Sequence, residues 1–566
     1  MTPAEASRPA KQGATIALAG GGAVALATVA LLASLSSHEY LGYDSIWHVF
    51  IARQESWSSF FREVSDNAHP PVFYLLLKGA IKVLGKSLLA YRAWSILAVA
   101  ATTLLLARLT SRVTGNAPLA IAAAAAFGLS ANIFEVGLEV RSYAVFLAFA
   151  LVALSAYIQW LGARPGRATP QTRATFAAAL SAAILSHYSA FFLLGGMIAA
   201  PSLLYAIHPR WRIRLTRDLQ RHGAAAATMF GVPVAVGIAA FVAHVRHLPH
   251  GFNHVAEFML DRRLESLPAF ILRTTRSLVL LFIPGAGMQG LAGTLLAIVL
   301  MGGLCWLMMR RSVRGRGSVV PFVLLAVMAL LNLAAGLAGR YPYGGYMRHE
   351  LFLFPVAILC LFTAIEVARR TVPVRWSSSG LWTGVAALGV AANVWLALTT
   401  LTLTSMPLRQ EPMKRFEGYF GKPPAVLMTD QFNFIFVFGE FHEWTWHLRW
   451  EQPGRPMWQV WDVSRGGQRF EVCREREWQS DFTQPGFYAS VASCLQQAAA
   501  DRVAVFRPQQ GGNPAPRQIS AAPERVRKLA EAAGMEAVAV HVDGEDVYAQ
   551  FSKRAPQRKA DEAAPE

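Results

Sequence analysis

The sequence is short of charge, and acidic charge is the scarcer kind. Only 16% of its 566 residues are charged, with 35 acidic residues against 53 basic ones. A soluble protein of this size carries about a quarter charged residues. The shortage therefore argues against an ordinary soluble enzyme.

Long blocks of the chain are nearly free of charge. A transmembrane helix needs about 20 consecutive apolar residues, and a core helix of a soluble protein would show a polar stripe at every turn. The blocks show no such stripe. The first is too long for a signal peptide and more follow it, so we interpret it as a retained helix. The blocks are 14–35, 87–107, 142–162, 223–243, 290–309, 319–338, 351–365 and 380–404.

The shortage of acidic residues is confined to the first 404 positions. Residues 405–566 hold 20 basic and 21 acidic residues, so the whole basic excess lies before them. It lies largely in short loops between apolar blocks, which is how membrane orientation is encoded. We therefore expect no nucleic-acid partner and a multi-pass protein of a bacterial inner membrane.

Five basic clusters predict the topology. If all five are cytoplasmic, the number of spans between them must be even. This holds when residues 174–207 form a helical hairpin that turns near His187. The sequence then predicts about eleven transmembrane helices, with the N-terminus inside and the C-terminus outside. The clusters are Arg108 and Arg112; Arg164, Arg167 and Arg173; Arg210, Arg212, Arg214, Arg217 and Arg221; Arg310, Arg311, Arg314 and Arg316; and Arg369, Arg370 and Arg375.

Three parts follow from this pattern. Residues 1–13 form a cytoplasmic tail, 14–404 an all-α membrane domain, and 405–566 an extracytoplasmic α/β domain. In the last part, 425–429, 457–463, 502–506 and 536–541 are predicted strands, and 523–533 is a predicted helix between Pro523 and Gly534. Cysteine is scarce, with four in the chain. Cys473 and Cys494 both lie in this domain, where a disulfide is plausible in an oxidising compartment.

Polar residues of four separate segments fall on the predicted outer side. Ionisable residues beside membrane spans are costly and are candidates for function. Each one alone also has an ordinary interpretation, such as an interfacial anchor, a helix start or a lipid headgroup contact. Their convergence on one membrane face favours a site. The segments carry Glu39, Asp44, His48, Asp66 and His69; Glu135, Glu139, Arg141 and Tyr143; His187 and Tyr188; and Arg348 and His349.

Several short motifs resemble those of a known family. The first loop contains Gly42-Tyr43-Asp44 and the run from Asp66 to Leu77, DNAHPPVFYLLL. Arg141-Ser142-Tyr143 begins one span, and Arg348-His349 precedes Pro355. Together they resemble the GT-C class of glycosyltransferases. Within that class they are similar to the family 39-like group of protein O-mannosyltransferases, lipid A aminoarabinose transferases and core galacturonosyltransferases. The resemblance covers most of 14–404.

The resemblance implies a GT-C fold and transfer of a sugar from a polyprenyl-phosphate donor. In this family an aspartate of the first outer loop is the catalytic base, and it corresponds to Asp44. Many members have Asp-Glu there, whereas this chain has Asp44-Ser45. Arg348 and Arg141 are expected to bind the donor phosphate. The residues expected to line the site or hold the acceptor are His48, Asp66, His69, Glu139, His187 and His349.

Phosphate is a good leaving group, so we expect no nucleotide and no required cofactor. The His and Asp residues leave a divalent metal possible, because such residues are common metal ligands. The acceptor would be an extracytoplasmic glycan, lipid or protein. The alternative function is a transporter or flippase of lipid-linked saccharides. A transporter would place its ionisable residues near the bilayer midplane, often in broken helices, and 284–290 does interrupt an apolar stretch.

Overall fold

The computed structural model describes, apart from a few single residues, 3–36, 43–65, 69–162, 169–207, 209–247, 258–261, 265–281, 319–345 and 347–371. In the C-terminal part it describes the helices and strands between 426 and 553. The chain divides into two compact units. The first is 1–41 with 48–404, here called the membrane domain, and the second is 42–47 with 405–566.

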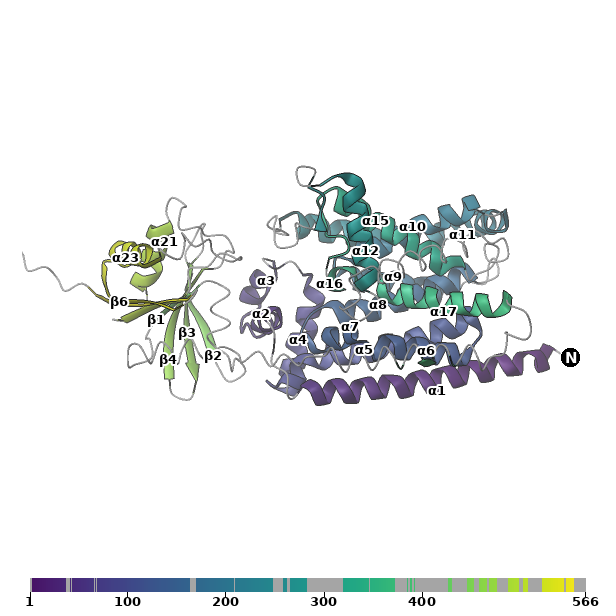
Figure 1. Ribbon diagram of the computed structural model, residues 1–566, viewed down its shortest axis with the longest axis horizontal. Helices are drawn as coiled ribbons and strands as arrows, with labels where there is room; N and C mark the ends of the chain where they lie inside the picture. The colour runs from purple at the N-terminus through teal and green to yellow at the C-terminus, as the bar shows by residue number, and fades with distance from the viewer. Residues whose placement is uncertain are drawn as a thin grey trace, which may run out of the picture. The chain divides into compact units, whose positions relative to one another are not determined.

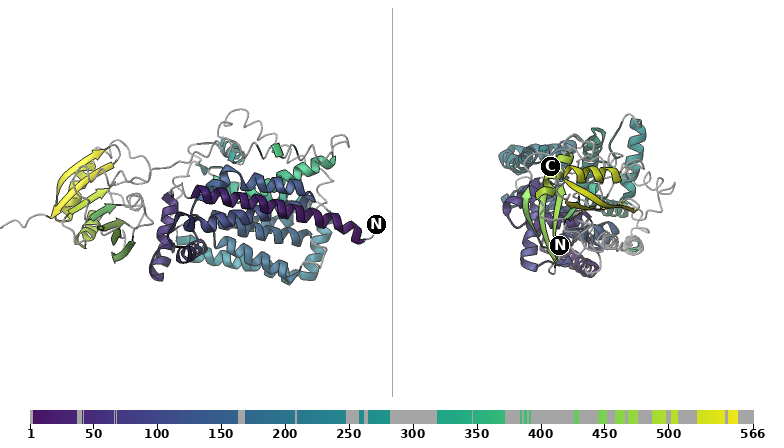
Figure 2. Two further views of the ribbon diagram at one scale, coloured as in Figure 1. Left: turned by 90° about the horizontal axis from the view of Figure 1, so that it is seen from below. Right: turned by 90° about the vertical axis from the view of Figure 1, so that its left-hand side faces the viewer.

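The described part of the membrane domain is helical (Figures 1 and 2). Its first half contains α1 (Pro3–Ser36), α2 (Tyr43–Ala52), α3 (Trp57–Ser65), α4 (Pro71–Leu84), α5 (Leu88–Thr114), α6 (Ala117–Gly128), α7 (Ala131–Leu138) and α8 (Tyr143–Gly162). Its second half contains α9 (Pro170–Ile184), α10 (Ala190–Ile207), α11 (Pro209–Ala243), α12 (Leu267–Leu281), α15 (Val320–Leu337), α16 (Met347–Glu350) and α17 (Phe354–Thr371).

Five of the described helices are long and apolar enough to cross a membrane: α1 from Gln12, α5, α8, α11 and α15. The pair α6 and α7 makes a sixth if it is one span bent by 54°. The predicted hairpin over 174–207 is confirmed, because α9 and α10 pack against each other and His187 lies in the turn between them. The predicted spans 290–309 and 380–404 lie outside the described residues, so the total of eleven stays a prediction.

Small residues bring the first helices close together. A Cβ added at Gly21 of α1 would lie 2.5 Å from the Cβ of Ala107 of α5. A Cβ at Gly128 of α6 would lie 2.7 Å from Oγ1 of Thr103. Membrane helices have no hydrophobic driving force between them and use small residues to increase backbone contact. The glycines therefore fix α1, α5 and α6 as one packed group, which Figure 2 shows with α1 along its length.

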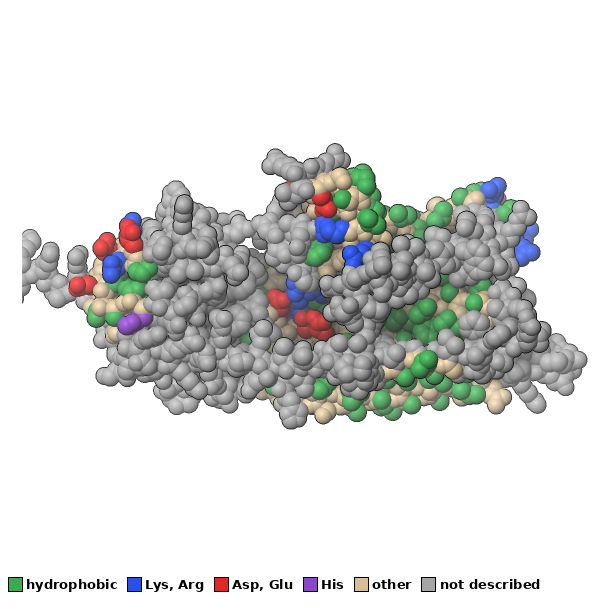
Figure 3. Space-filling model, in the orientation of Figure 1, with side chains coloured by type: hydrophobic (Ala, Val, Ile, Leu, Met, Phe, Trp, Pro, Cys, Tyr) green, Lys and Arg blue, Asp and Glu red, His purple; other side chains and the backbone are tan. Residues whose placement is uncertain are grey.

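The basic segments meet at one end of the bundle. Arg370 donates to the carbonyl of Thr114 at 2.7 Å, which joins the last turns of α17 and α5. Trp160 Nε1 of α8 donates to Asp218 Oδ2 of α11 at 3.0 Å. In Figure 3, Lys and Arg side chains lie at the right-hand end of the bundle, others lie near acidic side chains in the middle of the view, and hydrophobic side chains lie along the bundle between them. The described residues of four predicted basic clusters therefore lie at one end of the bundle, and the cluster Arg310, Arg311, Arg314 and Arg316 lies outside the described residues.

Arg92 ties the other end together. Its side chain is buried, and it donates to the carbonyl of Leu138 at 2.5 Å and to that of Ser36 at 2.8 Å. Ser95 donates to the carbonyl of Glu139 at 2.9 Å. These bonds satisfy backbone carbonyls at the ends of α1 and α7 that their own helices leave open. They fix the segment that leads to Arg141.

The second unit is an α/β domain, as predicted. Its sheet has the order β2-β3-β4-β1-β5-β7-β6, with β1 parallel to β4 and β5 and the other neighbours antiparallel. The strands are β1 (Val426–Thr429), β2 (Thr445–Glu451), β3 (Trp458–Arg465), β4 (Gln468–Glu475), β5 (Arg502–Phe506), β6 (Met535–Asp543) and β7 (Asp546–Lys553). The helices are α21 (Phe487–Gln497) and α23 (Ala522–Ala532).

The four predicted strands correspond to β1, β3, β5 and β6, and the predicted helix is α23. Three strands and one helix were not predicted. In β7, Ala549 and Phe551 are buried with Gln550 between them, which is the alternation of a half-buried strand. Cys473 and Cys494 are both buried in one apolar cluster of this domain. The disulfide stays a prediction for the oxidised protein.

Candidate active site

Three histidines from separate segments meet at the end of the membrane domain away from the basic segments. The ring centroids of His48 and His69 lie 5.1 Å apart, and those of His69 and His187 lie 5.3 Å apart. His48 comes from α2, His69 directly precedes α4, and His187 lies in the turn between α9 and α10. All three were predicted site residues, and the structure brings them together.

Local sequence explains how His69 reaches this position. Pro70 is the N-cap of α4 and Pro71 its first residue. Proline suits the first turn because the helix leaves that N–H without a partner. The two prolines therefore start α4 at a fixed place and hold His69 at its entrance. Ser142 Oγ lies 3.5 Å from His69 Nδ1, which connects this entrance to the start of α8.

Aromatic rings enclose the histidines. His48 stacks on Tyr74 with centroids 5.0 Å apart, and His187 lies 4.9 Å from the ring of Tyr143 and 5.6 Å from that of Phe146. The backbone N–H of Ser189 donates to His187 Nδ1 at 3.1 Å. Since Nδ1 accepts a hydrogen bond, a neutral His187 carries its proton on Nε2. Its ring therefore offers one donor.

Burial keeps two of these histidines neutral. Removal from water lowers the pKa of His187 to about 3, and the charges of Arg141 and His48 contribute to that lowering. Burial also holds the pKa of His69 well below its usual range, with contributions from His48, His187, Arg141 and His349. Near neutral pH both imidazoles are uncharged. The positive charge of the site thus comes from arginine.

Arg141 lies between α7 and α8 and is buried. Its guanidinium lies 5.1 Å from the ring centroid of Tyr143 and 4.0 Å from a carboxylate oxygen of Glu139. The charges of Arg141 and Arg348 both act on Glu135 of α7. The two predicted phosphate-binding residues therefore share a neighbouring acid, although they come from distant parts of the sequence.

The segment 340–350 completes the site. Tyr341 Oη donates to the carbonyl of His349 at 3.2 Å, and it is 2.8 Å from Ser189 Oγ. This pair connects the segment to the turn that holds His187. Arg348 and His349 lie in the short helix α16, and His349 is buried.

A buried carboxyl group organises this segment. The backbone N–H of Gly344 donates to Glu350 Oε1 at 2.8 Å, and Asn332 Nδ2 of α15 donates to Oε2. Gly344 has φ +75°, which favours glycine, and a Cβ there would overlap the backbone of Thr274. Burial raises the pKa of Glu350 to about 8. Glu350 therefore holds the chain on which Arg348 and His349 are placed.

The remaining predicted residues are placed as follows. Asp44 lies half-buried in the first turn of α2, four residues before His48, and belongs to the second unit. Its catalytic role stays a prediction. Glu139 is half-buried beside Arg141. Asp66 lies outside the described residues.

Sequence reasoning did not select Tyr341, Ser189, Asn332 or Glu350. Two of these, Asn332 and Glu350, have a sequence feature that could have identified them. Asn332 is a polar residue within the apolar run 319–338, and polar residues inside spans are functional candidates. Glu350 follows directly on Arg348-His349 at the start of the next apolar run. Ser189 and Tyr341 had no such signal, since both are ordinary at membrane interfaces.

No group of three or more His, Cys, Asp and Glu residues in the described part of the chain is arranged to hold a metal ion. Asp66, which precedes His69 by three residues, does not enter this test because it is not among the described residues.

No family model matches the sequence. No curated protein matches it either. Among solved structures, the chain is similar to ArnT from Cupriavidus metallidurans in the apo state, with a TM-score of 0.53 and 12% identity. That match covers 93% of this chain and 97% of ArnT. The chain thus has the GT-C fold predicted from its motifs.

Two other solved structures are similar at lower scores. ArnT from the same organism bound to undecaprenyl phosphate has a TM-score of 0.49 at 12% identity, over 93% of this chain and 97% of that one. The apo oligosaccharyltransferase of Archaeoglobus fulgidus has a TM-score of 0.41 at 12% identity, over 74% of this chain and 64% of that one.

Proposed function

We propose that the protein is a membrane glycosyltransferase that moves a sugar from a polyprenyl-phosphate donor to an extracytoplasmic acceptor. The observation that carries this proposal is the cluster of His48, His69, His187 and Arg141, built from four segments at one end of a GT-C fold. A fold by itself does not determine function, so the argument depends on the chemistry of these side chains.

The arginines suit the phosphate of the donor. A guanidinium can donate two parallel hydrogen bonds to a phosphate. Because the site is buried, its charge is screened less than it would be in water. Arg348 and Arg141 would bind the phosphate and stabilise the negative charge that it gains on departure.

The neutral histidines suit hydroxyl groups. His187 would present its Nε2 proton to an oxygen of the sugar or acceptor, and His69 would act as a second uncharged partner. His48 and His349 would line the rest of the site, and Glu139 would keep Arg141 in place. Neutral imidazoles bind hydroxyl groups without competing with the arginines for the phosphate.

The reaction is a direct displacement. The acceptor hydroxyl oxygen forms a bond to the anomeric carbon, and the bond from that carbon to the phosphate oxygen breaks. The electron pair leaves with the phosphate, which yields polyprenyl phosphate and the glycosylated acceptor. Asp44 takes the acceptor proton as general base. Asp66 and Glu139 are the alternative bases.

No nucleotide or ATP enters this balance, so we propose that no cofactor is required. A divalent metal stays possible because Asp66 lies close in sequence to His69. Dialysis against a chelator followed by addition of Mg²⁺ or Mn²⁺ decides this point. Activity that survives chelation would assign the chemistry to the side chains alone.

The purified full-length chain tests the function directly. It should transfer labelled sugar from a polyprenyl-phosphate donor to envelope lipids or glycans in proteoliposomes. Mass spectrometry of envelope glycans from a deletion strain identifies the sugar and the acceptor. Transport of a lipid-linked saccharide across the vesicle without any transfer would contradict the proposal. The 54° bend between α6 and α7 is the feature that favours this transport alternative.

A further inference from the structure

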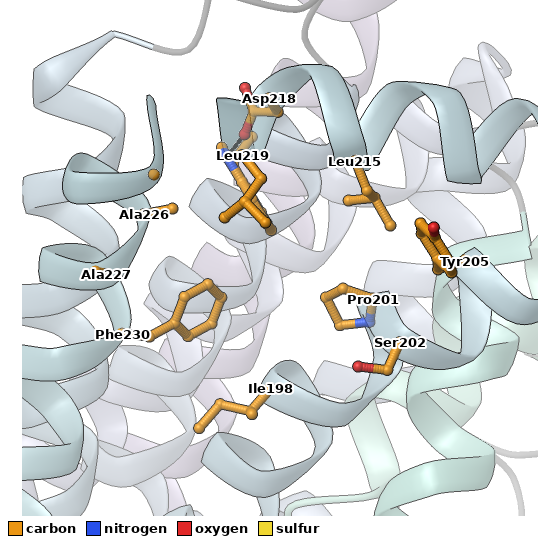
Figure 4. A pocket seen from close by; sticks show the side chains of 12 residues that line it. Ile198, Pro201, Ser202, Tyr205, Leu215, Asp218, Leu219, Ala226, Ala227 and Phe230 are labelled. Carbon is orange, nitrogen blue, oxygen red and sulfur yellow. Dashed lines mark hydrogen bonds between the residues drawn. The ribbon is translucent and has the colours of Figure 1, made fainter. Parts of the chain in front are cut away.

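A cavity lies between α8, α10 and α11, at the basic end of the bundle (Figure 4). Its volume is about 590 Å³, within the range of small-molecule sites. Trp160 lines it and lies 17 residues after Tyr143 on α8, a distance of roughly 25 Å along the helix. The cavity is therefore separate from the proposed active site.

The walls of this cavity are largely apolar. Ile198 and Pro201 come from α10, Leu215 and Leu219 from the first half of α11, and Phe230 from its second half. Figure 4 shows these side chains facing a common space. An apolar cavity of this size suits a hydrocarbon chain, because burial of each methylene is favourable.

The first half of α11, which contributes Leu215, Asp218 and Leu219 to the cavity wall, is strongly basic in sequence. His222 has non-helical backbone angles and divides α11 into a basic half, 209–221, and an apolar half. The basic half carries Arg210, Arg212, Arg214, Arg217 and Arg221 with one acid, Asp218. Asp218 is already engaged, since it accepts from Trp160 at 3.0 Å and its charge acts on Arg214. A basic amphipathic helix of this kind lies in the membrane interface.

One arginine is held directly over the cavity wall. The Arg212 guanidinium lies 5.5 Å from the ring centroid of Tyr205, which lines the cavity. A cation over an aromatic ring is held by the ring quadrupole. Membrane orientation would explain the arginines alone. It does not explain why Arg212 lies over Tyr205, which lines an apolar cavity.

We propose that this cavity binds one acyl chain of an anionic phospholipid while Arg212 and the neighbouring arginines hold its phosphate. Charge complementarity selects an anionic headgroup over a neutral one, and the apolar walls select a lipid over free phosphate. The site does not depend on the proposed glycosyltransferase activity, because its residues are distinct from those of the histidine cluster.

Native mass spectrometry of the full-length protein in detergent tests the site. Phosphatidylglycerol and phosphatidylcholine are added in turn, and the retained lipid is measured. Wild type should retain phosphatidylglycerol in preference. Gly223→Leu should reduce that retention about tenfold by filling the cavity, since a Cβ there meets only Leu219 Cδ1 at 3.8 Å. Gly231→Leu is the matched control on the same helix, where a Cβ meets nothing within 4 Å.

The headgroup is tested by charge. Arg212→Gln should reduce the preference for phosphatidylglycerol about fivefold, the contribution of one basic residue near an anionic membrane surface. Arg108→Gln removes the same charge at another exposed position and should leave retention unchanged. Equal retention of both lipids, equal loss in both glycine variants, or no loss in either would overturn the proposal. Displacement of phosphatidylglycerol by added polyprenyl phosphate would also overturn it, because the cavity would then bind the lipid of the sugar donor.

Discussion

The rings of His69 and His187 lie 5.3 Å apart, although one residue stands at the entrance of α4 and the other in the turn between α9 and α10. Both are held uncharged by burial, and Arg141 supplies charge beside them. A phosphate-binding cation next to neutral hydrogen-bonding rings is an arrangement that single residues in the sequence do not reveal.

Changing Asp44 to Asn tests the proposed base. Asparagine keeps size and hydrogen bonding but cannot accept the proton, so the transfer rate should fall about a hundred- to ten-thousandfold. The measurement is turnover with a polyprenyl-phosphate-sugar donor, after thermal unfolding has shown that the variant is folded. Glu55→Gln, an exposed acid after α2, is the control. Turnover close to wild type in Asp44→Asn would move the assignment to Asp66 or Glu139.

Changing Arg348 to Ala tests phosphate binding. The donor KM should rise and turnover should fall about a hundred- to a thousandfold, because the leaving phosphate loses a charged partner. Arg348→Lys keeps the charge but not the forked pair of hydrogen-bond donors, so its donor KM and turnover should lie between those of wild type and Arg348→Ala. Arg340→Ala removes an exposed arginine of the same segment and serves as control. An unchanged donor KM in Arg348→Ala would remove this residue from the phosphate site.

The histidine cluster should make stability depend on pH. The pKa of His187 is about 3 in the folded protein against an ordinary value of 6.5. The unfolded chain therefore binds a proton first as pH falls, and stability is lost below pH 6.5 at up to about 1.4 kcal/mol per pH unit. His187→Gln should remove this part of the dependence. Thermal unfolding in detergent at about pH 7 and about pH 5 measures it, and identical pH profiles would refute the prediction.

Glu350 should give the pH dependence of stability the opposite sign. Its pKa is about 8 in the folded protein against an ordinary 4.5, so the folded chain keeps a proton that the unfolded chain releases. Stability therefore falls as pH rises from 4.5 to about 8. Glu350→Gln, which is neutral at all pH values, should flatten that slope. Thermal unfolding of both proteins across this range compares them, and parallel curves would show that Glu350 is not buried in its acid form.

Cysteine labelling tests the orientation. On a cysteine-free background, Arg217→Cys should be protected from an impermeant maleimide added to intact spheroplasts, and Arg340→Cys should react. A cysteine at position 500 should react as well. Protection of residue 500 would place the C-terminal domain inside and would contradict the assignment of the histidine cluster to the donor side.

The sequence was sufficient for the membrane class because a soluble protein rarely contains long charge-free blocks. It was also sufficient for the fold, since the motifs around Asp44, His69 and Arg141 pointed to the GT-C class. It predicted β1, β3, β5 and β6, whose apolar runs are easily recognised. It missed β2 and β4, in which charged residues such as Arg449 and Glu451 of β2 and Arg469 and Glu471 of β4 alternate with other residues, as in strands with an exposed face.

The site was predictable in part for a physical reason. His48, His69, His187 and Arg141 are costly beside a membrane, so their convergence on one predicted face indicated a site. Ser189 and Tyr341 act through a hydrogen bond between distant segments, and nothing local marks them. Glu350 became identifiable only through its contacts, because Gly344 and Asn332 donate to it from other parts of the chain.

The edge strands of the sheet in the second unit affect whether neighbouring copies of this domain can associate. Both of its edge strands carry an extra residue: β2 loses register between Leu448 and Trp450, and β6 between Ala537 and Ala539. Such bulges interrupt the row of backbone donors and acceptors that a strand of another molecule would need. Proteins in a membrane are confined to a plane, where copies meet often. Irregular edges allow these domains to stand side by side without joining their sheets.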